Sequence, residues 1–374
     1  MTEPRQKICL CMIVKDEAQV IARCLTSVRP LIDHWVIVDT GSSDMTRAIV
    51  RDTLRDVPGE LFDRPWVNFA HNRTESLALA RSHGDYALLI DADDTLRIDP
   101  DFARPVLDRD SYMIMIESPP ARWPLGQLFR NAAGWRYAGV LHEFPVCDLP
   151  NPTSGLLRGV TIQRGSDGAR RKDPEVFRRD AALLENALAT EQDPMLAARY
   201  RFYLAQSYRD AGDMPNALTN YLIRANAGQW EQEVYVSLLE AAQAQQQLGH
   251  PADHIMATLA AAQRACPDRA EAFHAASRLC RATGRYAEGF AHAERGLRVA
   301  EPEEALFATP WIYRYGLLDE YAVAASWIGR YQDCLEACLR LLREEWLPES
   351  DRPRVRDNAR LARDRLMALI AQEA

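Results

Sequence analysis

The amino-acid sequence predicts an α/β domain followed by an all-helical repeat domain. Up to about residue 165, short apolar runs alternate with amphipathic stretches, as expected for a mostly parallel sheet with helices on both faces. After about residue 175 the strand signals end, and alanine-rich amphipathic helices take their place. With 374 residues, the chain is long enough for each domain to bury its own core.

The elements of the first domain follow from its apolar pattern. Buried strands are predicted at the continuous apolar runs 7–14, 35–38, 86–90 and 113–116. Residues 17–28 carry apolar side chains on one face and predict a helix. A second helix follows Ser43 and Asp44, either of which can cap it, and a third spans residues 72–83 until Gly84 ends it.

The second domain shows a repeat built on glycines. Gly212, Gly249, Gly284 and Gly329 each precede a similar pattern that ends in a small or apolar residue, and the steps between them are 37, 35 and 45 residues. This resembles tetratricopeptide repeats, whose period is about 34, because a glycine allows a tight reversal between paired helices. A generic helical bundle is the alternative. We therefore expect an α/β domain over residues 1–168 and a tetratricopeptide-like domain over 169–374, beginning with a basic linker or lid at 169–180.

Composition limits the classes of partner and the compartment. The net charge of −8 and the pI near 5.6 argue against a nucleic-acid partner, which favours a basic surface. The apolar run 8–14 is too short to span a membrane, so we expect no transmembrane segment. The eight cysteines include no CxxC pair, and we expect them to be free thiols in a cytoplasmic protein.

Aspartates follow two of the predicted strands. Asp39 comes after the strand 35–38, and Asp91 and Asp93 follow the strand 86–90. In extended backbone, residues two apart point the same way, so both carboxylates can meet one hard cation, Mg²⁺ or Mn²⁺. Helix capping is the ordinary alternative. A calcium loop is excluded, because Leu96 stands where glycine is needed and Phe102 where glutamate is needed.

Five sequence blocks then show a resemblance to a known family. The blocks are MIVKDE at 12–17, VDTGSSD at 38–44, NFAHNR at 68–73, LIDADD at 89–94 and GVLHE at 139–143. In this order they resemble family 2 glycosyltransferases, and more narrowly the bacterial subgroup in which tetratricopeptide repeats follow the catalytic domain. RYRFYLAQSY at 199–208 and GQWEQE at 228–233 resemble the helical part of that subgroup. The resemblance covers nearly the whole chain.

The resemblance implies a GT-A fold, an inverting reaction and a UDP- or GDP-sugar as donor. Val14 and Glu17 would line the nucleoside pocket, and Asp39 would accept a hydrogen bond from the ring N–H of the base. Asp91 would hold the ribose and contribute to metal binding.

The resemblance also implies how the metal would be held. Asp93 would be the surer metal ligand, and His142 would reach the metal or the pyrophosphate. A divalent cation suits the reaction, because negative charge develops on the departing diphosphate.

Inversion needs a base on the face opposite the leaving group. Glu143 is the candidate, with Asp94 and Glu117 as alternatives. Glu143 has a competing interpretation as the partner that orients His142 or a nearby arginine.

Two basic features are candidates for binding the diphosphate. Arg73 lies in the first turn of a predicted helix, with Asn72 as a cap, so that its guanidinium and the helix N-terminus can both face phosphate. Arg171 and Lys172 follow a glycine-containing loop that could fold over the bound donor. The alternative is a solvated linker, paired with nearby acidic residues.

The acceptor is less closely defined than the donor. Stacked repeats form a concave surface suited to an extended peptide, which favours a peptide or protein acceptor over a saccharide or small molecule. A homodimer formed through the repeats is the competing use of that surface. Two further classes are alternatives: a sugar nucleotidyltransferase, which would need a glycine-rich phosphate loop near the first strand, and a non-catalytic repeat scaffold with a vestigial α/β domain.

Overall fold

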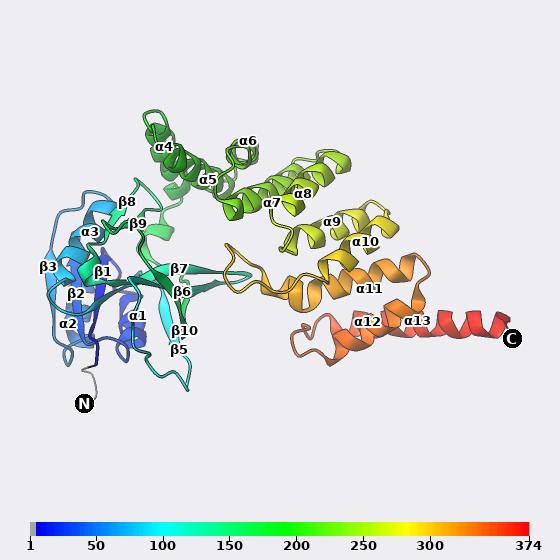
Figure 1. Cartoon of the computed structure of the whole chain (residues 1–374), viewed down its shortest axis with the longest axis horizontal. Helices are drawn as coiled ribbons and strands as arrows, with labels where there is room; N and C mark the ends of the chain where they lie inside the picture. Colours follow the sequence, from blue (N-terminus) through cyan, green and yellow to red (C-terminus); the bar gives the residue numbers. More distant parts are fainter. Residues whose placement is uncertain (1–4, 374) are drawn as a thin grey trace. The chain divides into compact units, whose positions relative to one another are not determined.

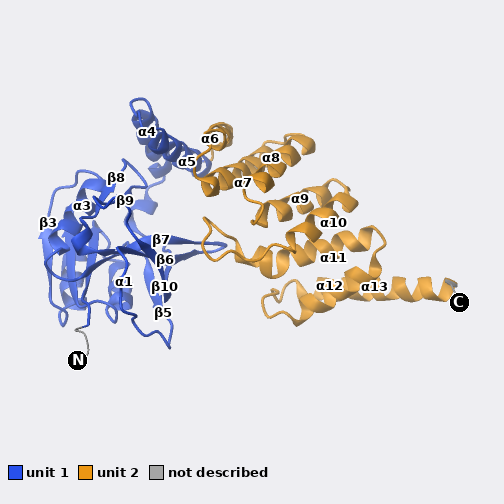
Figure 2. Ribbon diagram, viewed as in Figure 1, with its two compact units in different colours: residues 1–211 blue, residues 212–374 orange. Residues whose placement is uncertain are grey.

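The computed structural model describes residues 5–373, and these form two compact units that divide between Ala211 and Gly212 (Figure 2). The first unit holds the β-strands and five α-helices, and the second holds α-helices throughout. The prediction of an α/β domain followed by a helical domain is confirmed. No described helix combines the length and the apolar content that crossing a bilayer requires.

The first unit is organised around one mixed sheet (Figure 1), with strand order β3-β2-β1-β4-β7-β6-β10-β5. Strands β8 and β9 form a separate antiparallel pair. The bounds of the strands are β1 (Ile8–Val14), β2 (His34–Asp39), β3 (Gly59–Asp63), β4 (Tyr86–Leu89), β5 (Thr95–Ile98), β6 (Ser111–Ser118), β7 (Ala121–Arg130), β8 (Arg136–Ala138), β9 (Phe144–Val146) and β10 (Ser154–Gln163).

The sheet has a parallel half and a mixed half. Strands β3, β2, β1 and β4 are parallel neighbours, so their carboxyl ends lie along one edge. Beyond β4 the direction reverses at β7, and of the remaining pairs only β6 and β10 are parallel. The predicted, mostly parallel arrangement therefore holds for the half that carries the predicted aspartates.

Helices cover both faces of the parallel half, as predicted. The helices of this unit are α1 (Ile21–Val28), α2 (Thr46–Thr53), α3 (Phe69–Ala80), α4 (Val176–Leu188) and α5 (Pro194–Asp210), with short 3-10 turns η1 (Asn131–Ala133) and η2 (Ala169–Lys172). Alternate residues of β1 point to opposite faces. Leu10 and Met12 pack with side chains of α1 and α2, whereas Cys9 and Cys11 pack with side chains of α3. This two-sided burial explains the unbroken apolar run in the sequence.

Two predicted helix starts are wrong: the first helix begins at Ile21 and not at residue 17, and the third begins before Asn72. The third helix begins at Phe69, and the side chain of Asn68 caps it by accepting a hydrogen bond from the backbone N–H of His71. Asn72, the predicted cap, is fully buried inside the helix. Its side chain bonds to the preceding loop, accepting from Val67 N–H and donating to the Pro65 carbonyl. The sequence does not show which of Asn68 and Asn72 caps the helix, because both are asparagines close to its start. The path of the preceding loop decides it.

The second unit consists of successive helices, of which α7 packs on α8, α9 on α10, and α11 on α12. Their bounds are α6 (Met214–Asn226), α7 (Glu231–Gln247), α8 (Ala252–Ala265), α9 (Glu271–Ala282), α10 (Tyr286–Gly296), α11 (Leu317–Trp327), α12 (Tyr331–Arg343) and α13 (Arg352–Glu373), with a π-helical turn η3 (Ile312–Gly316) before α11. Gly249, Gly284 and Gly329 follow α7, α9 and α11 with φ of +73°, +72° and +79°. Gly212, which follows α5, has φ of +82°, so the predicted turn chemistry is present at all four glycines.

The long step of 45 residues between Gly284 and Gly329 has a structural cause. The extra residues lie between α10 and η3, and they are anchored on a fully buried ion pair between Arg269 and Glu271. The Glu271 carboxylate accepts from the Tyr313 hydroxyl at 2.8 Å, and Arg269 donates to the Leu306 carbonyl at 3.0 Å. The insertion is thus held by hydrogen bonds rather than left as a loose loop.

The predicted domain boundary at residue 168 marks the change from strands to helices, but the first compact unit continues to Ala211. The reason is an apolar cluster that joins Leu141 to Ala181 and Leu184 of α4 and to Tyr200 and Leu204 of α5. The first two helices after the sheet therefore belong to the same unit as the sheet.

Candidate functional site

The predicted site residues gather at the carboxyl ends of β2, β1 and β4, which are neighbours in the sheet. Asp39 ends β2 and pairs in register with Val14, the last residue of β1. Asp91 follows β4 on the other side of β1. Open α/β sheets bind ligands outside the carboxyl ends of their strands, so this edge is the expected place for a nucleotide.

Asp39 is fully buried, and only one of its two carboxylate oxygens accepts hydrogen bonds. Its Oδ1 accepts hydrogen bonds from Ser42 N–H at 2.8 Å, from Gly41 N–H at 3.0 Å and from Arg47 at 2.8 Å. Its Oδ2 is buried and has no hydrogen-bond partner among the described residues. Burial raises the pKa of Asp39, but the hydrogen bonds from Arg47 and Ser42 outweigh it and hold that pKa below its ordinary value. A charged, buried oxygen without a partner is costly unless a ligand supplies a donor.

Asp91 is held by arginines. Its Oδ1 lies 2.6 Å from Arg73 Nη2, and its Oδ2 lies 3.7 Å from Arg164. Although burial raises the pKa of Asp91, the charges of Arg73 and Arg164 lower it to about 2. Arg73 also places its Nε 2.6 Å from Glu143, whose side chain is only 8% exposed. The structure therefore joins the predicted base and the predicted ribose-binding carboxylate through one half-buried arginine.

This arrangement bears on the roles expected for Arg73 and Glu143. The guanidinium of Arg73 is occupied by two carboxylates within the protein, so it is not free to face a diphosphate in this conformation. Glu143 contacts Arg73 and can orient it, which is the alternative role predicted for this residue. The Arg73 guanidinium also lies 5.8 Å from the centre of the Tyr137 ring.

Asp93 and Asp94 diverge after the strand. Asp94 is fully buried, and its Oδ1 accepts from Gly165 N–H at 2.8 Å. Burial, reinforced by the charge of Asp91, raises the pKa of Asp94 to about 7 despite the nearby Arg164. The Asp93 carboxylate, in contrast, makes no hydrogen bond or ion pair with the residues that the structure describes. Of the two, Asp93 is the one available to a ligand.

A segment that we call the strap, residues 164–172, lies across these aspartates. Gly165 and Gly168 approach so closely that a Cβ would stand 2.0 Å from the Asp93 carbonyl oxygen and 2.9 Å from its Oδ2, respectively. Asp167 accepts two hydrogen bonds from Arg23, at 2.9 and 3.0 Å. The strap is therefore docked on the site and is not a free linker.

The strap also reaches the predicted nucleoside pocket. The backbone N–H of Ala169 donates to the carboxylate of Glu17 at 3.2 Å, and Lys172 donates to Gln19 at 2.7 Å. Burial raises the pKa of Glu17 to about 7, although the Ala169 N–H acts in the opposite direction. Arg171 is exposed. Of the two predicted basic residues, Lys172 is thus tied to the loop after β1, and Arg171 faces solvent.

His142 lies in a turn built against α5. Its backbone has φ of +51°, which is uncommon for a residue with a side chain, and its ring stacks on Tyr203 with centroids 3.8 Å apart and planes 8° from parallel. Arg199 donates to the His142 carbonyl at 3.0 and 3.3 Å. Neither Tyr203 nor Arg199 was predicted as a site residue, because only the fold brings α5 to this turn.

The three predicted metal ligands are not assembled into a cluster. Within residues 5–373, no group of three or more histidine, cysteine, aspartate or glutamate side chains is arranged to hold a metal ion. Asp91 is engaged by Arg73, whereas Asp93 has an unbonded carboxylate. A magnesium-like ion that arrives with a nucleotide diphosphate needs only one or two carboxylates, since phosphate oxygens and waters complete its shell. The donor set thus fits an ion shared with a diphosphate better than a resident metal.

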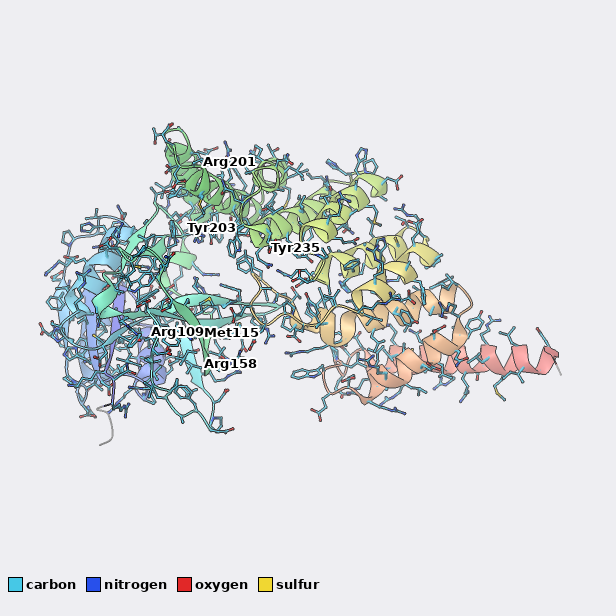
Figure 3. The ribbon with its side chains drawn as sticks, in the orientation of Figure 1. Arg109, Met115, Arg158, Arg201, Tyr203 and Tyr235 are labelled. Carbon is cyan, nitrogen blue, oxygen red and sulfur yellow. The ribbon has the colours of Figure 1, made fainter. Side chains whose placement is uncertain are left out.

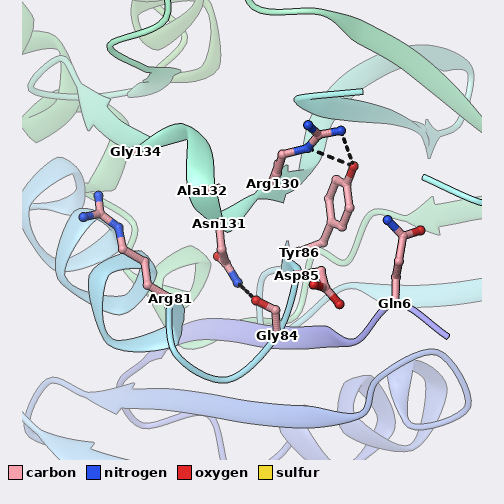
Figure 4. A pocket seen from close by; sticks show the side chains of 9 residues that line it. All are labelled: Gln6, Arg81, Gly84, Asp85, Tyr86, Arg130, Asn131, Ala132 and Gly134. Atoms are coloured by element: carbon pink, nitrogen blue, oxygen red, sulfur yellow. Dashed lines mark hydrogen bonds between the residues drawn. The ribbon is translucent and has the colours of Figure 1, made fainter. Parts of the chain in front are cut away.

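A separate pocket lies at the other end of β4, at Tyr86, where Arg130 donates to the Tyr86 hydroxyl and Asn131 donates to the Gly84 carbonyl (Figure 4). None of the predicted site residues lines it. Several residues that surround the predicted site were not predicted as site residues: Arg23, Arg47, Arg164, Arg199 and Tyr203. Arg47 shows why: it is eight positions from Asp39, in a helix whose rotation about its axis the sequence does not specify.

Comparison with known proteins gives two kinds of match. Residues 9–109 match the glycosyl transferase family 2 domain, a span that includes Val14, Glu17, Asp39, Arg73 and the aspartates after β4. A TPR repeat-containing protein of Synechococcus elongatus is 33% identical over 146 residues, 37% of this chain and 35% of that protein. An uncharacterized glycosyltransferase of Rickettsia felis is 33% identical over 93 residues, 24% of this chain and 30% of that protein. The chain thus spans about a third of each relative's length.

Similar solved structures include a tetratricopeptide repeat protein and TarS of S. aureus. A tetratricopeptide repeat protein from Parabacteroides merdae covers 54% of this chain and 75% of its own, with 14% identity and a TM-score of 0.39. TarS from S. aureus covers 67% of this chain and 83% of its own, with 14% identity and a TM-score of 0.30.

Proposed function

We propose that this chain, which carries a glycosyl transferase family 2 domain ahead of tetratricopeptide-like helices, is an inverting, metal-dependent transferase. Its donor would be a UDP- or GDP-linked hexose, and its acceptor a hydroxyl or thiol. The observation that carries the proposal is the group of carboxylates at the ends of three adjacent parallel strands, where Asp39 keeps a buried oxygen without a partner and Asp93 keeps an unbonded carboxylate.

The nucleoside would bind between β1 and β2. The free Oδ2 of Asp39 would accept the ring N–H of a uracil or guanine, which satisfies an oxygen that is otherwise buried at a cost. Val14 and Glu17 would form the side of the pocket at the end of β1. Lys172 and Arg171, at the end of the strap, would come to face the diphosphate when the donor displaces the present contact between Lys172 and Gln19.

The diphosphate would lie beside Asp93. When bound, a Mn²⁺ or Mg²⁺ ion would stabilise the negative charge of the departing diphosphate. Asp93 would hold that ion, His142 would contact the ion or the pyrophosphate, and Asp91 would fix the ribose while remaining paired with Arg73.

Glu143 and Asp94 are the first two candidates for the base that takes the proton of the acceptor, and Glu117, which pairs with Arg97 at 3.3 Å, is the third. Glu143 is bound to Arg73 and would have to be released from it, whereas Asp94 is covered by Gly165 of the strap. Replacing the true base by its amide should lower kcat by about 10²- to 10⁴-fold and leave donor binding within a few-fold. Glu143→Gln and Asp94→Asn, compared in one assay, therefore distinguish them.

The repeat unit would supply the acceptor site. Stacked helix pairs suit an extended peptide or protein, and we favour such an acceptor over a saccharide or small molecule. A homodimer through the repeats is the competing use of this unit. The eight cysteines are free thiols, seven of them buried, which supports a cytoplasmic location as part of this proposal.

Calorimetry with UDP and GDP, with and without Mn²⁺, tests the proposal. We expect one nucleotide to bind more tightly when Mn²⁺ is present, and Asp93→Asn to abolish that difference. Asp39→Asn should weaken nucleotide binding with or without the metal, whereas Asp63→Asn is the matched control, because Asp63 contacts the same Arg47 but is 72% exposed. A non-catalytic scaffold would bind neither nucleotide, and that result would refute the proposal.

If a nucleotide binds, two further experiments identify the donor sugar and test the reaction. A mass-spectrometric screen of nucleotide sugars for metal-dependent hydrolysis would identify the hexose, because transferases commonly pass sugar to water when no acceptor is present. Arg171→Ala combined with Lys172→Ala should then raise the donor KM or lower kcat. Unchanged kinetics would remove these two residues from the donor site.

A further inference from the structure

The turn that carries His142 is held by one face of helix α5. Tyr203 stacks on the imidazole, and the Arg199 guanidinium lies 4.9 Å from the centre of the Tyr203 ring. Two residues before His142, the backbone N–H of Val140 donates to the Tyr200 hydroxyl at 3.3 Å. Residues 199, 200 and 203 of α5 lie on one helical face, so a single helix contacts the turn at several points. Tyr203 is labelled on α5 in Figure 3.

The turn is one that the chain would not hold unaided. His142 has a positive φ, a conformation that costs free energy for a residue with a Cβ and persists only where neighbouring contacts enforce it. The contacts that enforce it come from Arg199, whose Nε and Nη2 both donate to the His142 carbonyl. The guanidinium is in turn packed 5.0 Å from the centre of the Phe144 ring, so it bridges both sides of the turn.

The same turn is connected to the aspartates after β4. Glu143 follows His142 directly and pairs with Arg73, which pairs with Asp91. A displacement of the turn would therefore move the imidazole and would also disturb the ion pair between Glu143 and Arg73. Helix α5 and the carboxyl edge of the sheet are linked through contacts of 2.6 to 3.8 Å.

We propose that Tyr203 and Arg199 are positioning residues of the transfer site, and that α5 is a working part of it although it follows the sheet domain in the chain. Tyr203 fixes the plane of the His142 imidazole, and Arg199 fixes the backbone that presents it. This inference rests on the proposed function, in which His142 contacts the metal or the pyrophosphate. Groups that orient a metal ligand without touching the metal commonly change metal affinity by about 10- to 100-fold.

The test compares Tyr203→Leu with Tyr203→Phe in the full chain. Both variants lose the hydroxyl, so the difference between them reports the aromatic ring alone. Binding of Mn²⁺ in the presence of UDP, measured by calorimetry, should weaken by about tenfold in Tyr203→Leu and by less than about twofold in Tyr203→Phe. Arg199→Met, which keeps the aliphatic stem but removes the donors, should resemble Tyr203→Leu, and Arg199→Lys should be intermediate.

His142→Ala separates failure of this inference from failure of the proposed function. If His142→Ala weakens Mn²⁺ binding while Tyr203→Leu and Tyr203→Phe behave alike, the positioning role is refuted and the proposed function stands. If His142→Ala has no effect, the role of His142 fails, and the positioning role fails with it.

If the wild-type chain binds no Mn²⁺ in the presence of UDP, the choice of this nucleotide and metal is refuted. A second measurement then tests the positioning role without either ligand. NMR of histidine-labelled protein reports the His142 ring directly, because a stacked tyrosine shifts its resonances. We expect Tyr203→Leu, but not Arg73→Lys, to abolish that shift and to broaden the signal as the turn loses its single conformation. A His142 resonance that stays sharp and changes only by the lost ring current in Tyr203→Leu would overturn the inference.

Discussion

At the scale of single residues, the carboxylates of the site differ in what satisfies them. Asp91 is neutralised by Arg73, and Asp94 is desolvated and receives a backbone N–H. Asp39 keeps one buried oxygen without a hydrogen-bond partner, and the Asp93 carboxylate makes no hydrogen bond or ion pair with the described residues. A ligand that supplied a donor to Asp39 and a cation to Asp93 would complete the set, which is why we look to a nucleotide and a metal together.

The sequence motif predicted these carboxylates because strand ends and their spacing are local properties. It could not predict their partners. Arg164 contacts Asp91 from 73 positions away, and Ala169 reaches Glu17 across 152 positions. Such pairings depend on how the strap crosses the sheet edge, which no local pattern encodes.

Gly165→Ala tests whether the strap is docked as the structure shows. The added Cβ would stand 2.0 Å from the backbone carbonyl of Asp93, so either the strap or the end of β4 must move. We expect trypsin to cut the chain within residues 164–172 about tenfold faster for every 1.4 kcal/mol of docking that is lost. Ser166→Ala, at an exposed neighbour, is the control and should cleave at the wild-type rate. Equal rates for both variants would mean that the strap does not rest on Asp93.

Glu17 predicts a pH dependence of stability. Its pKa in the folded chain is about 7, above the ordinary value of 4.5, because burial disfavours the charged form. Between these two pH values the folded chain holds a proton on Glu17 that the unfolded chain has lost. The free energy of unfolding is therefore highest below pH 4.5 and falls as the pH rises to about 7. Glu17→Gln stays neutral, so its stability relative to wild type should rise over this interval and be constant above it.

Thermal unfolding at pH 4.5 and pH 8 measures this effect. Since Glu17 is only partly buried, solvent screening reduces the gain to about 1 kcal/mol, or roughly 2–4 °C for a cooperative unit of the size of Met1–Ala211. A difference between Glu17→Gln and wild type that is the same at both pH values would contradict the shifted pKa.

At the scale of elements, the sequence predicts a strand or helix correctly where the segment is buried on both faces or where its apolar residues recur at a regular spacing. Strands β1, β2, β4 and β6 were found because they are unbroken apolar runs. Strands β7 and β10 were missed because they depart from both strand patterns. The first contains Pro124 and Gly126 and is half exposed, and the second carries a register shift between Leu156 and Thr161. The short edge strand β3 lacks enough residues to show any period.

The repeat glycines are the clearest element signal, and they make a graded prediction. Gly284 has φ of +72° and has nothing within 4 Å of where a Cβ would stand, so its requirement is conformational and not steric. Gly284→Val should cost about 1–2 kcal/mol of unfolding free energy. Gly284→Asn should cost less, because asparagine tolerates the left-handed region. Urea denaturation of the full chain ranks the two, and equal costs would show that the backbone conformation does not set the requirement.

At the scale of the whole molecule, the change in sequence pattern and the division into compact units fall at different places. Strands give way to helices near residue 168, but the first unit ends at Ala211. The sequence shows where secondary structure changes, and it does not show which apolar faces meet. Helices α4 and α5 read as the start of a repeat array, yet they cover Leu141 and Phe69 of the sheet domain.

This division predicts how truncated chains behave. A chain ending at residue 211 keeps Leu184, Tyr200 and Leu204 over Leu141, whereas a chain ending at 168 removes all three and exposes the apolar surface beneath them. We expect the 1–211 chain to unfold in a single cooperative transition and to remain monomeric. The 1–168 chain should aggregate or bind a hydrophobic dye, and it should lose the ordered turn at His142 together with its Tyr203 and Arg199 contacts. If instead both chains unfolded cooperatively at the same midpoint, the sheet domain would be complete at the boundary that the sequence pattern marks, and α5 would have no part in its stability.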